Sequence, residues 1–154
     1  MNKFLTPECY HTLLLEIDQI KNEQVPAIAE EIAIARSHGD LRENAQYASA
    51  REKQRMIESR LHELESVVSS HTVVNISEKI FERVTFGCRV EIEFEDDNAT
   101  KSFQILSDYD SDISKGIISI NSPIARSILD LSLNDVAEVT LNGKTRDIVI
   151  RKVG

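Results

Sequence analysis

The sequence predicts an α+β protein made of two parts. A long antiparallel helical hairpin is expected over residues 1–75, and a small, mainly antiparallel sheet domain with one helix over residues 76–154. Two observations support this division. Apolar residues recur every three or four positions before residue 70, and they alternate with polar residues after residue 87. A third is the break at Gly39, which suits the position after a helix C-terminus.

The first helix is predicted over residues 7–36. Thr6 suits an N-cap, and Pro7 suits the first helical position, where a proline has no hydrogen bond to lose. Pro26 lies within this stretch and crowds the preceding turn, so we expect the helix to kink or divide there. The apolar seam of this helix comprises Leu13, Ile17, Ile20, Gln24, Ile28, Ile32 and Ala35.

The second helix is predicted from about Leu41 to Ser69. Its seam follows a heptad pattern through Tyr47, Ala50, Gln54, Ile57, Leu61, Leu64 and Val68. Two helices joined by a tight turn can bury one stripe each, so they should pack antiparallel. At about 1.5 Å per residue, roughly 30 residues form an arm of about 45 Å. Gln24 and Gln54 fall at similar heights along this arm and are expected to face one another.

The period changes to two after residue 75, and apolar residues alternate with charged ones from Cys88 to Phe94. Returning strands are expected around Phe103 and over residues 117–120. Ser122 and Pro123 predict the start of a short helix that ends near residue 130. A final hairpin over residues 136–153 turns at Asn142-Gly143, which is typical of a type I′ turn.

Composition limits the functions that are open to this chain. Hydrophobic residues make up 41% and charged residues 29%, which suits a folded protein, and the formal net charge is −8. Each predicted part is acidic, so a stand-alone nucleic-acid binder is not expected, and contact with nucleic acid should be arranged by a protein partner. We expect no signal peptide and no membrane span. The two widely separated cysteines indicate a reducing, cytoplasmic setting.

Asp40 and Glu43, the tip acids, lie three residues apart between the two predicted helices. One interpretation is a capping box, in which both side chains satisfy free backbone N–H groups. The other is a site for a hard cation, because both carboxylates can face the same way. Two carboxylates alone bind Mg²⁺ weakly, since the ion prefers six oxygen ligands, so such a site would need ligands from elsewhere.

Two further segments allow a structural and a functional interpretation. Basic residues off the second seam, namely Arg51, Lys53, Arg55 and Arg60, are either a salt-bridged helix face or a strip that steers a phosphate chain toward the tip. The start of the short helix is either a plain capped turn or a docking surface. The scattered histidines show no metal-ligand spacing.

Together these segments resemble the bacterial Gre family of transcript cleavage factors, in its GreA branch. The resemblance extends over nearly the whole chain, and several separated motifs occur in the family's order. The segments that match are AR at 35–36, GDLRENA at 39–45, Tyr47, AREKQ at 50–54, Glu58, RL at 60–61, LE at 64–65, FG at 86–87 and ISINSPIAR at 118–126.

The resemblance implies a coiled-coil hairpin that enters the secondary channel of RNA polymerase, and an FKBP-like C-terminal domain that docks at the channel entrance. It implies that Asp40 and Glu43 help to hold a second Mg²⁺ in the polymerase's own active site, while the chain binds no metal alone and is no enzyme itself. The backtracked RNA 3′ end would then be cut by the polymerase. Tyr47, with Arg51, Lys53 and Arg55, would support the tip or contact this RNA.

The resemblance also places Ser122, Pro123, Ile124, Ala125 and Arg126 in the polymerase-docking region of a monomeric factor. One departure from the family is Gln46, which stands where an acid commonly precedes the tyrosine. Two other functions are open to the same fold. One is a channel-binding regulator that does not promote cleavage, which the intact tip acids disfavour. The other is a prolyl isomerase or chaperone, which the scarcity of aromatic residues disfavours.

Overall fold

The computed structural model describes residues 3–39 and 44–154 and divides the chain into two compact units. The hairpin unit comprises Tyr10–His71. The sheet unit comprises Met1–Cys9 together with Thr72–Gly154. The α+β class predicted from the sequence is confirmed. None of the helices in the described ranges combines the length and apolar character needed to cross a membrane.

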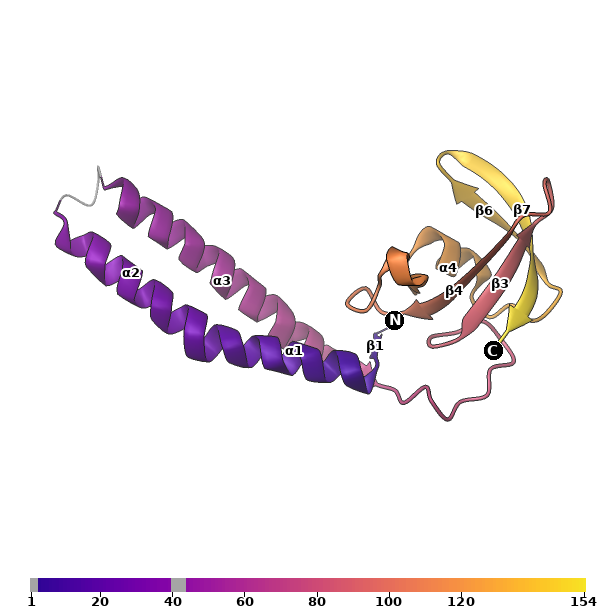
Figure 1. Cartoon of the computed structure of the whole chain (residues 1–154), viewed down its shortest axis with the longest axis horizontal. Helices are drawn as coiled ribbons and strands as arrows, with labels where there is room; N and C mark the ends of the chain where they lie inside the picture. The colour runs from indigo at the N-terminus through magenta and orange to yellow at the C-terminus, as the bar shows by residue number, and fades with distance from the viewer. Residues whose placement is uncertain (1–2, 40–43) are drawn as a thin grey trace. The chain divides into compact units, whose positions relative to one another are not determined.

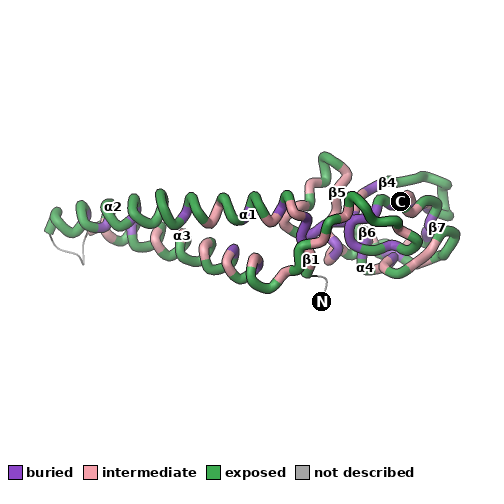
Figure 2. The backbone as a smooth tube through the Cα atoms, turned by 90° about the horizontal axis from the view of Figure 1, so that it is seen from below, coloured by how far each residue is buried: buried purple, intermediate pink, exposed green. Residues whose placement is uncertain are grey.

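The hairpin is built from α1 (Pro7–Gln19), the π turn η1 (Ile20–Gln24), α2 (Val25–Ser37) and α3 (Ala45–Ser70). Helices α2 and α3 run side by side (Figure 1). Their shared core is small: Ile28, Ile32 and Ala50 are buried, with Tyr47 and Ile57 packed against them. Figure 2 shows long exposed stretches along both helices, interrupted at intervals by buried or half-buried positions. Each helix therefore buries one narrow stripe.

Pro26 is accommodated by the π turn η1 rather than by a break in the helix. The Val25 N–H bonds to the Ile20 carbonyl, five residues earlier, and Pro26 then stands in the first turn of α2. A π turn takes up about one more residue than an α turn, so one of each spans about eight residues. Ile20 and Ile28 are eight residues apart, and both are buried. The π turn thus keeps the seam on one face of the helix.

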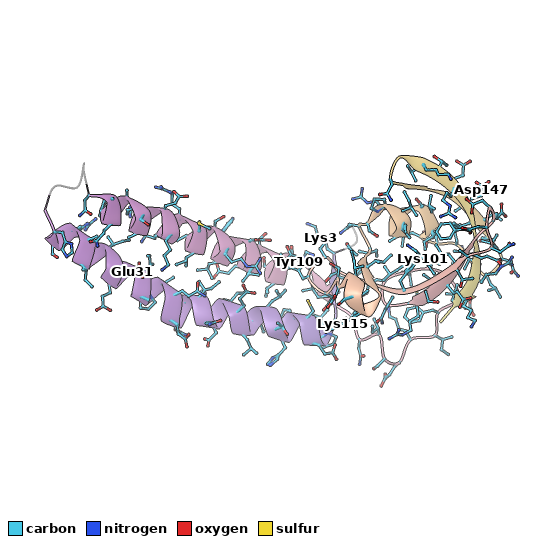
Figure 3. The ribbon with its side chains drawn as sticks, turned by 45° about the horizontal axis from the view of Figure 1, so that its top comes forward. Lys3, Glu31, Lys101, Tyr109, Lys115 and Asp147 are labelled. Carbon is cyan, nitrogen blue, oxygen red and sulfur yellow. The ribbon has the colours of Figure 1, made fainter. Side chains whose placement is uncertain are left out.

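Ion pairs join the helices along the edges of the seam. Arg60 donates through two nitrogens to Glu16 at 3.0 and 3.2 Å, and Lys21 lies 2.8 Å from Glu65. Glu31, labelled in Figure 3, pairs with Lys53 at 3.2 Å. Exposed pairs of this kind contribute up to about 1 kcal/mol each. They specify the alignment of the helices more than they stabilise the hairpin.

Two details of the predicted hairpin are wrong. The second helix begins at Ala45 rather than near Leu41, because Asn44 supplies its N-cap. Gln24 is exposed, and the Gln54 side chain accepts a hydrogen bond from Arg51 at 2.7 Å instead of facing Gln24. Gln24 lies within the π turn, and it lines a small cavity with Ile28 of α2 and Ile57 of α3.

The N-terminal residues belong to the sheet unit. Strand β1 (Phe4–Leu5) pairs in parallel with β2 (Thr72–Val73). Thr6 caps α1 as predicted: its hydroxyl accepts from the Cys9 N–H at 3.1 Å and donates to the Asp110 carboxylate at 3.2 Å. Burial raises the pKa of Asp110 above its usual range. The start of the first helix is thereby tied to a loop far away in the sequence.

The main sheet has the order β5-β4-β3-β7-β6. Its strands are β3 (Arg89–Phe94), β4 (Thr100–Leu106), β5 (Ile117–Ser119), β6 (Val136–Leu141) and β7 (Lys144–Val153). The β4–β5 pair is parallel, and the other neighbours are antiparallel. As predicted, Asn142 and Gly143 have positive φ angles of 53° and 77° in the turn between β6 and β7.

One face of this sheet forms the core of the unit. On β3, Val90, Ile92 and Phe94 are buried, while Glu91 and Glu93 between them are only partly buried. Helix α4 (Pro123–Ile128) adds Ala125 and Ile128, both fully buried, to the same cluster. The period-two pattern therefore predicts correctly which side chains face the core.

Gly87 is expected to be indispensable for the stability of the sheet unit. Its φ angle is +95°, and a Cβ atom there would lie 2.5 Å from Ile76 Cγ2. Gly87→Ala should lower the free energy of unfolding by about 3 kcal/mol, measured by urea denaturation. Gly143→Ala is the matched control, because its φ is also positive but no atom lies within 4 Å. That change should cost only about 1 kcal/mol. Equal losses would exclude the contact with Ile76 as the cause.

Candidate functional site

Asp40 and Glu43 lie outside the residues that the structure describes, whereas the segments on both sides of them are described. α2 ends at Ser37, and the N-cap of α3 is Asn44. The capping-box interpretation needs Asp40 at the N-cap of the second helix. Since Asn44 occupies that position, the cap of α3 does not require the tip acids.

Asn44 joins the two helices at this end of the hairpin. Its Oδ1 atom accepts from the Tyr47 N–H at 3.0 Å, which caps α3. Its Nδ2 atom donates to the Ala35 carbonyl at 2.5 Å, in the last turn of α2. The Tyr47 N–H would otherwise lack a partner within its own helix, whereas the Ala35 carbonyl also accepts from the His38 N–H at 3.2 Å. One side chain thus fixes the end of one helix and the start of the other.

Tyr47 supports the same region. The Arg36 guanidinium lies over its ring, 5.7 Å from the ring centroid, in a cation–π contact between α2 and α3. Tyr47 is half-buried and also packs against Ile28, Ile32 and Ala50. Tyr47 therefore packs between α2 and α3 near their ends, and its role as a support of the tip stays a prediction, as does its contact with RNA.

The basic strip is largely engaged within the chain. Lys53 pairs with Glu31, and Arg55 pairs with Glu52 on the same helix. Arg51 donates to Gln54 at 2.7 Å. These contacts favour the interpretation as a salt-bridged helix face, because each cation already has a partner near its charge.

The docking segment, residues 122–126, forms the start of α4. The Ser122 hydroxyl accepts from the Ala125 N–H at 3.3 Å and so caps the helix. Pro123 and Arg126 are exposed, Ser122 and Ile124 are half-buried, and Ala125 is fully buried. A partner can therefore contact four of these side chains, whereas Ala125 anchors the segment to the core.

Asp108 orders the chain just before this segment. Its carboxylate accepts from the Ser119 hydroxyl and, at 3.1 Å, from Asn121 Nδ2. The Ser119 hydroxyl in turn accepts from the Asn121 N–H at 3.0 Å. Charge-assisted hydrogen bonds of this kind are stronger than neutral ones. Sequence reasoning missed both Asn44 and Asp108. The N-cap spacing from Asn44 to Tyr47 was an available signal, whereas Ala35 and the partners of Asp108 lie nine or more residues away without a characteristic spacing.

The described residues form no other evident metal-binding or nucleophilic site. They contain no group of three or more His, Cys, Asp or Glu side chains that could hold a metal ion. Both cysteines are buried and free. Burial and the nearby Asp110 carboxylate raise the pKa of Cys9 to about 11, and burial raises the pKa of Cys88. Neither thiol suits a nucleophile.

Comparisons with known proteins agree over the whole chain. Residues 3–73 match the model "Transcription elongation factor, N-terminal" of the GreA and GreB proteins, and residues 68–154 match "Transcription elongation factor, GreA/GreB, C-term". Transcription elongation factor GreA of Ruegeria pomeroyi is 40% identical over 149 residues, covering 97% of this chain and 95% of that protein. GreA of Helicobacter acinonychis is 40% identical over 137 residues, covering 88% and 84%.

Among solved structures, the chain is similar to GreA factor homolog 1 of Thermus thermophilus. The identity is 20% and the TM-score 0.45, with 98% of this chain and 97% of that one covered.

Asp108 is expected to hold Asn121 in place before the docking segment. Asp108→Ala should raise the hydrogen-exchange rate of the Asn121 amide about tenfold, because Ser119 loses the carboxylate that orients its hydroxyl. Asp112→Ala is the matched control, since Asp112 caps the neighbouring turn through Ser114 instead. An unchanged rate in Asp108→Ala would contradict this role.

Both thiols are expected to be unreactive in the native chain. With a pKa of about 11, Cys9 is about one part in a thousand thiolate at pH 8, and the fraction rises only as the pH approaches that value. Titration with the disulfide reagent DTNB at pH 8 should detect almost no thiol before unfolding and two per chain in urea. Rapid reaction of either cysteine in the folded protein would refute the burial described here.

Proposed function

Since the chain belongs to the GreA/GreB family of transcription elongation factors, we propose that it docks on RNA polymerase and stimulates the polymerase's own cleavage of backtracked transcripts. The observation that supports this most is the pair Asp40 and Glu43 in the short segment between α2 and Asn44. Asn44 provides the N-cap of α3, so that cap does not account for the two acids.

The proposed role of the two acids is to complete a metal site. Two carboxylates supply too few ligands for Mg²⁺, which takes six oxygens and retains water. In the proposed mechanism the remaining ligands come from the polymerase active site, once the hairpin has entered the secondary channel. A second Mg²⁺ held there would activate a water molecule and stabilise the leaving oxygen of the RNA. The chain itself is then a cofactor of the polymerase and not a nuclease.

The fixed flanks of the tip favour this mechanism. Asn44 bonds to both helices, and the Arg36–Tyr47 contact lies next to it. Contacts of this kind fix the residues on either side of the tip before the chain binds. Less conformational entropy is then lost when the metal site forms.

The docking segment would contribute affinity rather than chemistry. Pro123 and Arg126 are exposed at the start of α4, and Asp108 orders the residues that precede them. In this proposal a single copy of the chain acts in the cytoplasm, with the RNA 3′ end contacted inside the complex. The internal pairing of Lys53 and Arg55 leaves the polymerase to position most of that RNA.

Removing the tip acids should abolish cleavage and preserve binding. With stalled, backtracked elongation complexes, the variant Asp40→Ala/Glu43→Ala should release the 3′ fragment about a hundredfold more slowly than the wild type, because the second Mg²⁺ loses two ligands. Its affinity for RNA polymerase should be unchanged. Calorimetry of the free chain with Mg²⁺ should detect no tight site.

The matched control is Asp18→Ala/Glu23→Ala, which removes two carboxylates far from the tip in the sequence and should cleave normally. Equal cleavage by the wild type and the tip variant would refute the mechanism. Inhibition of nucleotide addition without cleavage would instead identify a non-cleaving channel regulator.

A further inference from the structure

Strand β6 lies at one edge of the main sheet, with β7 on one side and no strand of the described residues on the other. Leu141 and Lys144 flank the two-residue turn and lie opposite one another, the positions that form a hydrogen-bonded pair in such hairpins. On the same side of β7, the Ile150 N–H donates to the Asp135 carbonyl at 2.9 Å. Because bonded pairs recur at every second residue, three residues of β6 point their N–H and C=O groups away from β7. These edge residues are Val136, Glu138 and Thr140.

The backbone of the three edge residues is open. All three are exposed, and Val136 is 57% exposed. Within the described ranges, the chain supplies no further strand or backbone partner for their outward N–H and C=O groups. Helix α4 covers the buried face of β6, since Ala125, Ile128 and Val139 share one apolar cluster. An open edge of this kind can accept a further strand from another chain.

Three carboxylates form a row beside this edge. Glu138 lies opposite Asp147 of β7, which is labelled in Figure 3. The Glu95 N–H donates to the Asp147 carbonyl at 3.0 Å, so Glu95 continues the row at the end of β3. Each of the three residues is exposed and stands next to a buried residue in the sequence. Since successive side chains of a strand point to opposite faces, the three carboxylates share the exposed face.

The chain does not neutralise this row. None of the three carboxylates has an ion pair in the part of the chain that the structure describes. The two arginines of β7 are engaged elsewhere: Arg146 pairs with Asp96, and Arg151 pairs with Glu93, both at 2.6 Å. The described acids do not group closely enough to hold a metal ion. Like charges on opposite residues of a sheet repel, so a cationic side chain placed at this edge would be attracted.

The edge and the row together identify the occupant. A strand added to β6 would place one side chain opposite Glu138, where Lys or Arg would extend the acidic row with a positive charge. A side chain two positions away would lie beside the exposed Val136. A second copy of the chain suits this edge poorly, because β6 contains no basic residue and its own Glu138 would be repelled. Nucleic acid is disfavoured as well, since its phosphates carry the same charge as the row.

We propose that β6 binds an extended, basic segment of a protein partner as an added strand. In the bound state, Lys or Arg lies opposite Glu138 and an apolar residue lies beside Val136. Backbone hydrogen bonds to the three edge residues supply affinity, and the acidic row supplies specificity. This surface shares no residue with the tip acids or the docking segment, so binding here is separate from the action proposed at RNA polymerase.

A peptide tests the proposed chemistry directly. The full-length, isotope-labelled chain is titrated with acetylated Ser-Val-Ser-Arg-Ser-Val-Ser, which presents valine, arginine and valine on one face in either direction. Saturable NMR shifts are expected at the amides of the three edge residues. Replacing the arginine of the peptide by glutamate should weaken binding at least about tenfold. N-methylation of the arginine amide, which faces β6, should abolish the shifts, whereas N-methylation of the serine that follows, whose amide faces solvent, should preserve them.

Glu138→Lys should weaken binding of the arginine peptide at least about tenfold. The matched control Glu78→Lys makes the same change in net charge outside the strands of the main sheet and should bind normally. Unshifted amides elsewhere in the spectrum verify that each variant is folded. Absence of shifts at the edge residues, equal weakening in both variants, or equal loss with both methylated peptides would overturn the proposal. Shifts of the same amides on concentrating the chain without peptide would identify a second copy as the occupant instead.

Discussion

A hairpin of two helices can bury only one stripe from each, so its stability depends on keeping the two stripes opposed over their whole length. Because the two helices bury so little apolar surface, the free energy lost when their alignment shifts cannot be recovered from other contacts. The ion pairs of Glu16 with Arg60 and Glu31 with Lys53 penalise such shifts, because they connect the helices at well-separated heights. Asn44 then fixes the alignment at the closed end.

The sheet unit is stabilised in a different way from the hairpin. It buries one face of a five-stranded sheet beneath a single short helix and keeps many charged side chains on its surface. The same helix provides both the buried Ala125 and the exposed Pro123 and Arg126. A surface that is anchored in this way can be recognised by a partner without first becoming ordered. Core packing and presentation of a surface are therefore properties of one helix.

Periodicity predicted most of this architecture from the sequence. Seams of three and four indicated the helices, alternation indicated β3, and Asn142-Gly143 indicated the turn between β6 and β7. The hydrogen bond that Asn44 donates to the Ala35 carbonyl could not be predicted, because the position of that carbonyl depends on how the intervening chain folds. The contact of Asp108 with Asn121 likewise joins the segments that follow β4 and β5, two strands whose pairing has no sequence signature. The tip acids are identified by resemblance, since their spacing alone favours a capping box over a metal site.

The π turn also has a consequence for how related chains can differ in length. Deleting one residue between Ile20 and Val25 would leave Ile20 and Ile28 seven positions apart, a heptad spacing that an unbroken α-helix can satisfy. Pro26 would then lie inside that helix, where its ring meets the carbonyl four residues earlier. The helix therefore accommodates the proline only when it also contains the extra residue of the π turn. Relatives that lack one of them are expected to lack the other.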